Sequence, residues 1–352
     1  MQRVHHARGS SFLPKLTFVI TLGLITAATG FKASAVDVFT DPVGFVTANP
    51  VPNGFAFIGV GLTQIPAVRG LVGAVSGQTV PVNVALTPAA FNATSQGAQF
   101  YIEDLTGANA GFSDDIVSND AANVYTANND TGFLVNGDSF KIYPHQTLNT
   151  VFGPQNQAGL FGSNNAVNAD NVIVWNPVTQ SPVTYFYKST TATPGWRGPA
   201  GLLVDAGNTP LYVDQDIEIQ SKSATTSNSF KIVGAVKLGP TITVVPAGGF
   251  AFVGDMYATS LTLSNLNLYT GNPNTGVFGS NNAVNADNVI IWDPVAQSPI
   301  TYFFKSTTTT PGWRGPQGLL VDAGTNVLPL GCVLQIQHKV APTFTWTLPA
   351  QY

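Results

Sequence analysis

The chain has 352 residues, of which 44% are hydrophobic and only 9% are charged, with a formal net charge of −4. This hydrophobic fraction excludes a disordered chain, and 35 glycines with 24 prolines are typical of a β-protein with many turns. Because acidic residues outnumber basic ones and no basic cluster occurs, the chain cannot neutralise phosphates, which excludes nucleic acid as a partner.

The first residues have the pattern of a secretory signal peptide. A basic start precedes the apolar stretch 16–28, which is too short to span a bilayer comfortably. Small residues at 33–35 predict cleavage after Ala35, with a retained membrane anchor as the alternative. Removal of residues 1–35 leaves 352 − 35 = 317 residues and, because four of the 14 basic residues are lost, a net charge of 10 − 18 = −8.

The composition of the mature chain bounds its setting. No later stretch reaches roughly 18 uninterrupted apolar residues, so we expect no helical membrane span after signal cleavage. The single Cys332 rules out an internal disulfide, and the length suits two domains. We expect an exported protein that is extracellular or held at the cell surface or outer envelope, with the periplasm as an alternative.

An internal repeat is the strongest pattern in the chain. Residues 161–207 and 278–324 align without a gap and are identical at 40 of 47 positions. At three of the seven positions that differ, valine is exchanged for isoleucine or tyrosine for phenylalanine, which keeps an apolar body as interior strand positions would. The repeat therefore predicts two copies of one structural unit.

A second, shorter repeat locates an insert. Residues 54–59 match 249–254 at an offset of 195 rather than 117, which indicates an extra segment of 195 − 117 = 78 residues, near 60–144. Duplication then divides the chain into a signal peptide over 1–35, a first module over 36–222 with the insert at about 60–144, a second module over 223–340, and a C-terminal edge strand or tail over 341–352.

Local patterns predict strands throughout. The β-branched and aromatic run 172–175 ends at Asn176-Pro177, a turn signal. In the insert, 133–135 and 140–142 flank Asn136-Gly137, which predicts a hairpin. No amphipathic helix is expected. The predicted fold is all-β, with two duplicated β-sandwich-like modules and a small inserted β-domain after the signal peptide.

Several segments resemble a known family. They are TDPVGFVT at 40–47, GDSFKIYP at 137–144, TLNTVFG at 147–153, and an aromatic strand followed by Trp-Arg at 184–197 and again at 301–314. The combination resembles a family of uncharacterised exported proteins that occur as multiple paralogues in Verrucomicrobia-type bacteria. This chain departs from the family pattern in the long Thr-rich turn before Trp-Arg. The resemblance implies secretion and a cell-envelope setting, and it brings no activity.

No set of residues marks a catalytic site. The mature chain has two histidines, His145 and His338, and no Gly-x-Ser-x-Gly elbow. Cys332 and His338 are too few ligands for zinc. Asp130-Thr131-Gly132 has the letters of an aspartic-protease motif, but it follows polar turn formers, which favours a solvated turn. No pair of facing carboxylates indicates a glycosidase. We expect a protein that is not an enzyme.

Clustered Asp and Asn residues raise the question of calcium. Hard cations take oxygen ligands of this kind, but Asp and Asn also dominate turns because they bond their own backbone. Turn capping is favoured over a calcium site. No cofactor is expected, with Ca²⁺ as the weaker alternative. The weak calcium candidates are Asp114, Asp115, Asp120, Asp170 and Asp287.

Two glycine-flanked loops are the best candidate contact surface. An aromatic ring beside a guanidinium can stack on a sugar or hold a carboxylate, so the candidate ligand-binding residues are Trp196, Arg197, Trp313 and Arg314. In the favoured alternative, each tryptophan folds back onto its own sheet. Each arginine then pairs with Asp205 or, in the second copy, Asp322.

The last segment alternates apolar and polar residues over 344–352 and ends in Tyr352. This pattern resembles the closing strand of an outer-membrane barrel. Pro349 interrupts the ladder of such a strand, so an edge strand that covers the second module is favoured.

These patterns favour an exported, non-catalytic β-protein of the cell envelope or extracellular matrix with a structural or adhesive role. Two similar surfaces on one chain raise avidity without new contacts. The first alternative is a carbohydrate-binding protein that uses the duplicated Trp-Arg loops, and the second is an outer-membrane β-barrel. The expected partners are glycans or other envelope proteins, and the sequence assigns no oligomeric state.

Overall fold

The computed structural model describes residues 42–189, 193–212, 215–223, 229–254, 257, 259–306, 309–340 and 342–350. The predicted signal peptide lies outside these residues. Strands dominate the described chain, in which the one helix is the five-residue α2 (Leu148–Phe152). The predicted all-β fold is confirmed. Within the same ranges, no helix is long and apolar enough to cross a membrane.

The first repeat copy belongs to a five-stranded antiparallel sheet, called here the first repeat sheet. Its strand order is β13-β12-β11-β15-β2. The strands are β2 (Phe55–Gly59), β11 (Asn171–Asn176), β12 (Ser181–Lys188), β13 (Gly195–Arg197) and β15 (Asp216–Gln220).

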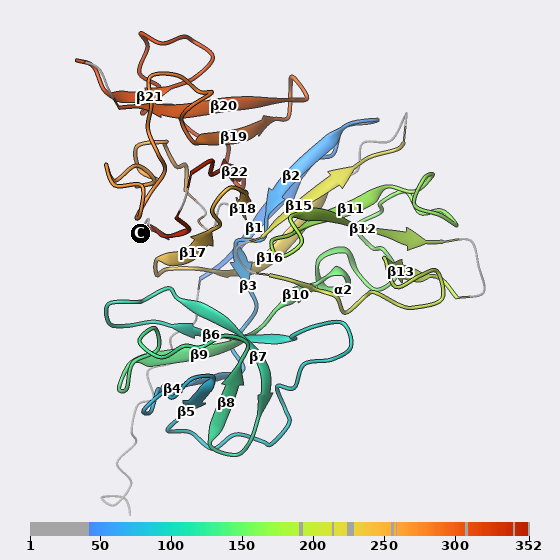
Figure 1. Cartoon of the computed structure of the whole chain (residues 1–352). Helices are drawn as coiled ribbons and strands as arrows, with labels where there is room; N and C mark the ends of the chain where they lie inside the picture. The colour runs from blue at the N-terminus through green and yellow to red at the C-terminus, as the bar shows by residue number, and fades with distance from the viewer. Residues whose placement is uncertain are drawn as a thin grey trace, which may run out of the picture. The chain divides into compact units, whose positions relative to one another are not determined.

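The second repeat copy forms a sheet with the same plan, called here the second repeat sheet (orange to red in Figure 1). Its order is β18-β22-β19-β20-β21, which matches the first strand for strand. Its strands are β18 (Phe250–Gly254), β19 (Asn288–Asp293), β20 (Ser298–Lys305), β21 (Gly312–Arg314) and β22 (Val333–Gln337).

One pair of differences between the copies is explained by the register. Val174 of β11 pairs with Val183 of β12, and the equivalent pair in the second copy is Ile291 with Ile300. Both partners of one cross-strand contact have therefore changed together. Because such pairs are the unit of sheet stabilisation, the exchange preserves a matched contact in each sheet.

Shorter sheets accompany each repeat sheet. The strand β16 follows position 222, the predicted end of the first module, yet it pairs with β1 at the start of the chain. In the predicted C-terminal tail, β23 pairs with β17, and its alternate side chains are buried. These strands are β1 (Val43–Ala48), β3 (Leu62–Thr63), β16 (Phe230–Val236), β17 (Thr241–Val245), β23 (Phe344–Leu348), and the short pair β10 (Gln146–Thr147) and β14 (Pro210–Leu211).

Residues 68–144 form a six-stranded antiparallel sheet, the insert sheet, inside the segment predicted as an insert (blue to green in Figure 1). The order is β4-β9-β6-β7-β8-β5, and the sheet has a hydrophobic core of its own. The strands are β4 (Val68–Leu71), β5 (Thr79–Pro81), β6 (Phe100–Asp104), β7 (Ser113–Asn119), β8 (Asn123–Thr126) and β9 (Ser139–Pro144).

The predicted hairpin around Asn136-Gly137 is wrong in one of its arms. A turn does occur there, with Gly137 at φ 94°, and β9 follows it. Residues 133–135 are not a strand that pairs with β9, because β4 and β6 occupy both edges of β9. Long-range pairing has therefore displaced the local partner that the sequence suggested.

Two glutamines join the repeat sheets reciprocally. The Gln180 side-chain amide accepts from Phe250 N at 2.8 Å and donates to Phe250 O at 3.3 Å. In the other direction, Gln297 accepts from Phe55 N at 2.7 Å and donates to Phe55 O at 3.1 Å. Both glutamines have left-handed φ angles, 49° and 51°, which a non-glycine residue adopts only when its surroundings demand it. The two copies therefore meet in a pseudo-symmetric contact.

The tryptophans of the two copies obey the same reciprocity. Trp175 packs against Phe252 with ring centroids 4.7 Å apart, and Trp292 packs against Phe57 at 5.1 Å. The insert sheet is joined to the strand β16 by a buried ion pair between Glu103 of β6 and Lys237, which directly follows β16.

The closest approach of β2 and β18 is made by Gly59 and Gly254, equivalent positions of the shorter repeat. A Cβ on Gly254 would collide with the Gly59 backbone. Gly254→Ala should therefore lower the free energy of unfolding by roughly 1–3 kcal/mol, as measured by urea denaturation. Gly239→Ala is the matched control, since a Cβ there meets nothing and its effect should be small. Equal loss of stability in the two variants would contradict this contact.

Candidate functional site

The tryptophans predicted to bind a ligand are buried in the structure. Trp196 has 0% of its surface exposed and Trp313 has 4%. The Trp196 Nε1 donates to the Gly153 carbonyl at 3.0 Å, and its ring lies edge-on to Tyr187 with centroids 5.5 Å apart. Trp313 packs against Phe304 in the same manner. Each ring is therefore part of the core beneath its own sheet and presents no face to a ligand.

The arginine beside each tryptophan is also buried and binds main-chain oxygens. Arg197 Nε donates to Leu202 O at 2.9 Å, Nη2 to Thr193 O at 2.8 Å, and Nη1 to Trp196 O at 2.7 Å. Nη1 also lies 3.4 Å from the Asp205 carboxylate. Arg314 repeats this set in the second copy at 2.9, 2.6 and 2.8 Å. The guanidinium therefore links the Trp-Arg strand, Thr193 before it and the loop that contains Leu202.

The structure thus does not place Trp196, Arg197, Trp313 or Arg314 where a ligand could reach them, contrary to the carbohydrate-binding alternative. Their arrangement is the one described by the competing prediction, in which the ring packs on its own sheet and the arginine pairs with an aspartate. The physical reason is that the Trp-Arg segment is a strand, β13 or β21, that pairs with β12 or β20 of its own sheet rather than an open loop.

The loops that these arginines contact are exposed and apolar. We call residues 201–205 and 318–322 the leucine loops. Leu203 is 90% exposed and Leu320 is 92% exposed. Their neighbours are about half exposed in both copies, at 49% for Leu202, 49% for Val204, 50% for Leu319 and 46% for Val321. A glycine with φ 107° or 103° opens the turn of each loop. Each repeat copy therefore exposes the same hydrophobic loop tip to solvent.

The calcium candidates on the repeat copies serve the backbone. Asp170 is buried and accepts from the backbone N–H groups of Phe161 and Lys222 at 2.7 and 2.6 Å. Asp287 does the same in the second copy and also lies 2.7 Å from His338 Nδ1. Each aspartate fastens the start of a repeat copy to the segment that follows β15 or, in the second copy, β22.

Asp120, another calcium candidate, caps a turn. Its carboxylate accepts from the backbone N–H groups of Ala122 and Asn123 at 2.8 and 2.7 Å and from the Tyr125 hydroxyl at 2.7 Å. Hydrogen bonds from the Asn123 side chain and from these groups hold the pKa of Asp120 well below its usual range. Over the described ranges, no cluster of three or more His, Cys, Asp or Glu side chains has a geometry that could hold a metal.

The Asp130-Thr131-Gly132 segment differs from its prediction as a solvated turn, because Asp130 is fully buried. Its neighbour Asp114 accepts from Asn128 N at 2.8 Å, Asn128 Nδ2 at 2.7 Å and Asp115 N at 2.9 Å. Burial raises the pKa of both carboxyls, that of Asp130 to about 7, and the adjacent Asp114 charge adds to that rise. Since Asp114 accepts these N–H bonds, the proton of the pair resides on Asp130.

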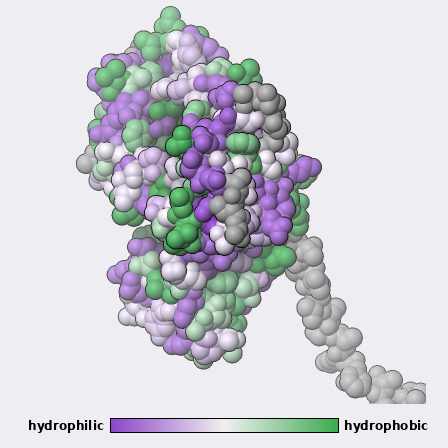
Figure 2. All heavy atoms as spheres, turned by 90° about the vertical axis from the view of Figure 1, so that its right-hand side faces the viewer, coloured by the Kyte–Doolittle hydropathy of each residue, from purple (hydrophilic) through white to green (hydrophobic). Residues whose placement is uncertain are grey.

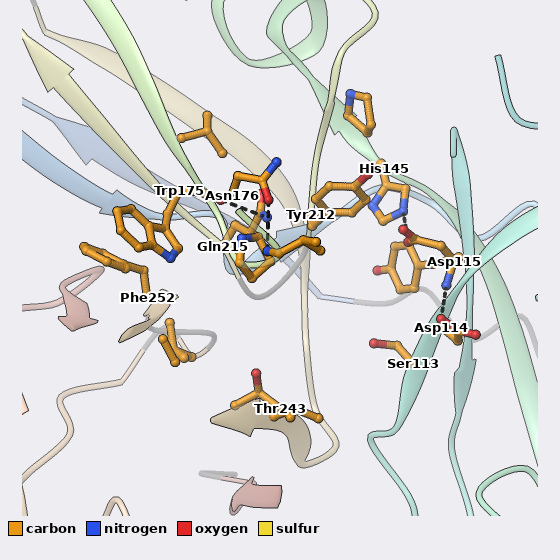
Figure 3. Close-up of a pocket in the computed structure, with 18 of the residues that line it drawn as sticks. Ser113, Asp114, Asp115, His145, Trp175, Asn176, Tyr212, Gln215, Thr243 and Phe252 are labelled. Atoms are coloured by element: carbon orange, nitrogen blue, oxygen red, sulfur yellow. Dashed lines mark hydrogen bonds and ion pairs between the residues drawn. The ribbon is translucent and has the colours of Figure 1, made fainter. Parts of the chain in front are cut away.

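A pocket of about 640 Å³ lies beside this pair. Its lining comes from the insert sheet around β7, from the first repeat sheet, from β18 of the second repeat sheet and from the separate strand β17. Figure 3 shows Trp175 and Phe252 on one side of the pocket and His145 with Asp115 on the other. Tyr212 and Gln215 lie between them. The volume falls within the range of roughly 300–1,000 Å³ that is usual for small-molecule sites.

His145 is the most constrained polar side chain of the pocket. Its Nε2 lies 2.9 Å from the Asp115 carboxylate, and its ring contacts Tyr101 and Tyr212 with centroids 4.8 and 5.0 Å apart. Its Nδ1 is buried and has no hydrogen-bond partner in the described part of the chain. Sequence reasoning did not find this arrangement, because Asp115 and His145 are 30 residues apart and no motif links them.

Comparison with protein-family models, with curated proteins and with solved structures gives no match to this chain. The site is therefore interpreted from its own geometry.

Proposed function

We propose that the chain is an exported, non-catalytic protein with a structural or adhesive role in the cell envelope or extracellular matrix. In this proposal, molecules associate through their two leucine loops. Export is taken from the N-terminal sequence pattern and from the family resemblance, which implies the same setting.

The observation that carries the proposal is the duplicated and exposed apolar tip. Each buried arginine donates to one carbonyl of its loop, Leu202 O or Leu319 O, and lies 3.4 or 3.3 Å from the aspartate that ends the loop. These contacts hold the two ends of the loop and reduce the conformational freedom that it loses on binding. Elsewhere on the surface, as on the face that Figure 2 shows, hydrophobic residues are interspersed with hydrophilic ones. An apolar run that is exposed at the same place in both copies marks a contact surface.

The partner that fits best is another molecule of the same chain. The leucine loops are identical in sequence in the two copies, so a loop of one molecule can meet a loop of the next in a nearly symmetric contact. Because every chain carries two such loops, the contact propagates beyond a dimer. Weak single contacts then sum to strong association, which suits a coat or matrix.

Charged substitutions at the two tips test this function. The double variant Leu203→Asp plus Leu320→Asp should be monomeric in sedimentation velocity, whereas the processed wild type should form dimers and larger species. Val167→Asp plus Val284→Asp is the matched control, since these valines are also repeated and are 77% and 82% exposed outside the loops. A wild type that stays monomeric at high concentration, or tip variants that associate like the wild type, would overturn the proposal.

A further inference from the structure

We infer that the pocket between the insert sheet, the first repeat sheet and β17–β18 binds a short, uncharged saccharide. The inference is independent of the leucine loops, since no residue of the loops lines the pocket. It assigns to the chain a binding site that differs from the Trp-Arg loops in place, in chemistry and in number.

The lining of the pocket favours a ligand with both apolar and hydroxyl-bearing faces. Aromatic rings come from all three contributing parts, among them Tyr101, Trp175, Tyr212 and Phe252. Neutral polar groups such as Ser113 lie among them, and no Lys or Arg occurs in the lining. Sugar rings present C–H faces that pack on aromatic side chains and hydroxyls that bond to neutral polar groups. Phosphates and carboxylates would find no cation here.

Three side chains of the lining have a buried hydrogen-bond acceptor without a partner among the described residues. Gln96 Nε2 donates a hydrogen bond to the Asp205 carbonyl at 3.1 Å, and Gln215 Nε2 donates to the Trp175 carbonyl at 3.3 Å. The Oε1 of each glutamine is buried without a partner in the described chain. His145 Nδ1 is also buried without a partner among the described residues, and it is an acceptor in the tautomer whose Nε2 donates to Asp115. Buried polar groups normally have a hydrogen-bond partner, so these three acceptors favour a ligand that carries hydrogen-bond donors.

Hydroxyls meet this demand better than an ammonium group does. Of the two carboxylates in the lining, Asp115 is paired with His145, and Asp114 already accepts its three N–H bonds. A cation would therefore have to break existing bonds to find a counter-charge. A neutral polyol leaves the carboxylates as they are and donates to the free acceptors.

The pocket is not expected to occur twice, although the repeat copies do. The insert supplies Gln96 and Ser113, and His145 directly follows its last strand. Over the described residues, no sheet equivalent to the insert sheet lies beside the second repeat sheet. At the position equivalent to Gln215, the second copy has Cys332. One saccharide should therefore bind per chain, whereas a site built on the Trp-Arg loops would bind two.

The test is binding of the processed protein to an array of short neutral saccharides, with sialylated and sulfated glycans and choline alongside. Calorimetry on the best neutral saccharide then gives the affinity and the stoichiometry. We expect retention of a neutral saccharide at one per chain. Ser113→Phe, which fills the pocket, and Gln96→Leu plus Gln215→Leu, which removes two acceptors, should each weaken binding about tenfold or more.

The matched control is Gln99→Leu, the same exchange at a glutamine outside the pocket lining, which should bind like the wild type. Circular dichroism and thermal unfolding establish that each variant is folded. Because there are two pocket variants, the test still applies if one of them does not fold. Retention of no neutral saccharide, preference for acidic glycans or choline, two sites per chain, or pocket variants that bind like the wild type would each overturn the inference. The leucine-tip variants should bind the saccharide normally, so failure of this site and failure of the assembly proposal are distinguishable.

Discussion

The substitution Asp130→Asn is expected to stabilise the insert sheet, and by roughly 2–3 kcal/mol more at pH 8 than at pH 5. Burial raises the pKa of Asp130 to about 7, well above the ordinary value of an aspartate. In the folded protein the side chain keeps a proton that the unfolded chain releases above pH 4. An asparagine amide at this buried position cannot ionise, so it is free of this pH-dependent cost.

The same linkage fixes the direction of the pH dependence for the wild type. Between pH 4 and 7 the folded chain holds protons that the unfolded chain has lost, so stability falls as pH rises through this window. Burial also raises the pKa of Asp104 to about 6 and of Asp216 to about 7, which adds in the same direction. Lys237, whose pKa is lowered to about 7 by burial, is protonated in both states over most of this range and adds little slope there.

Urea denaturation at pH 5 and pH 8 measures this effect, and hydrogen exchange of β6 and β7 reports on the insert sheet specifically. Asp120→Asn is the matched control. Its carboxylate is stabilised as an anion by the turn that it caps, so its loss should lower stability at pH 8. If the wild type were more stable at pH 8 than at pH 5, and Asp130→Asn changed nothing, the protonated pair would be refuted.

Trp196→Ala should lower the free energy of unfolding by about 3–5 kcal/mol, as expected for removal of a fully buried aromatic side chain. The variant leaves a cavity beside Phe152 and Tyr187 and removes the donor that satisfies the Gly153 carbonyl. Trp313→Ala should behave in the same way in the second copy.

Chemical denaturation followed by tyrosine absorbance or circular dichroism measures the loss. Leu203→Ala is the control, because an exposed side chain should change stability by no more than about 0.5 kcal/mol. A loss of less than about 1 kcal/mol in Trp196→Ala would mean that the ring is not in the core, and the Trp-Arg loops would again be candidates for ligand binding.

The sequence was informative where the same pattern occurs twice. Identity over 161–207 and 278–324 predicted two equal structural units, and the structure has two sheets of equal strand order. The exchange of Val174 and Val183 for Ile291 and Ile300 is apolar in both copies, as strand interiors require, and only the register reveals that it is one contact.

The sequence was less informative where residues far apart in the chain meet. Asp114 and Asp130 are brought together by the insert sheet, and Asp115 and His145 by the segment that leaves it. Neither pair has a spacing that a linear pattern could reveal. The Trp-Arg pair misled in the opposite way, because glycine-flanked aromatic residues are typical of binding loops. In this fold the same residues support a loop whose apolar tip carries the exposed surface.

Disulfide trapping tests the association of the leucine loops most directly. The single native Cys332 is buried, so cysteines at the loop tips can be followed alone. In the double variant Leu203→Cys plus Leu320→Cys, mild oxidation should give a ladder of multimers on a non-reducing gel, and the ladder should collapse on reduction. If the oxidised double variant ran only as a monomer, the leucine loops would not meet between molecules, and the proposed role would be contradicted.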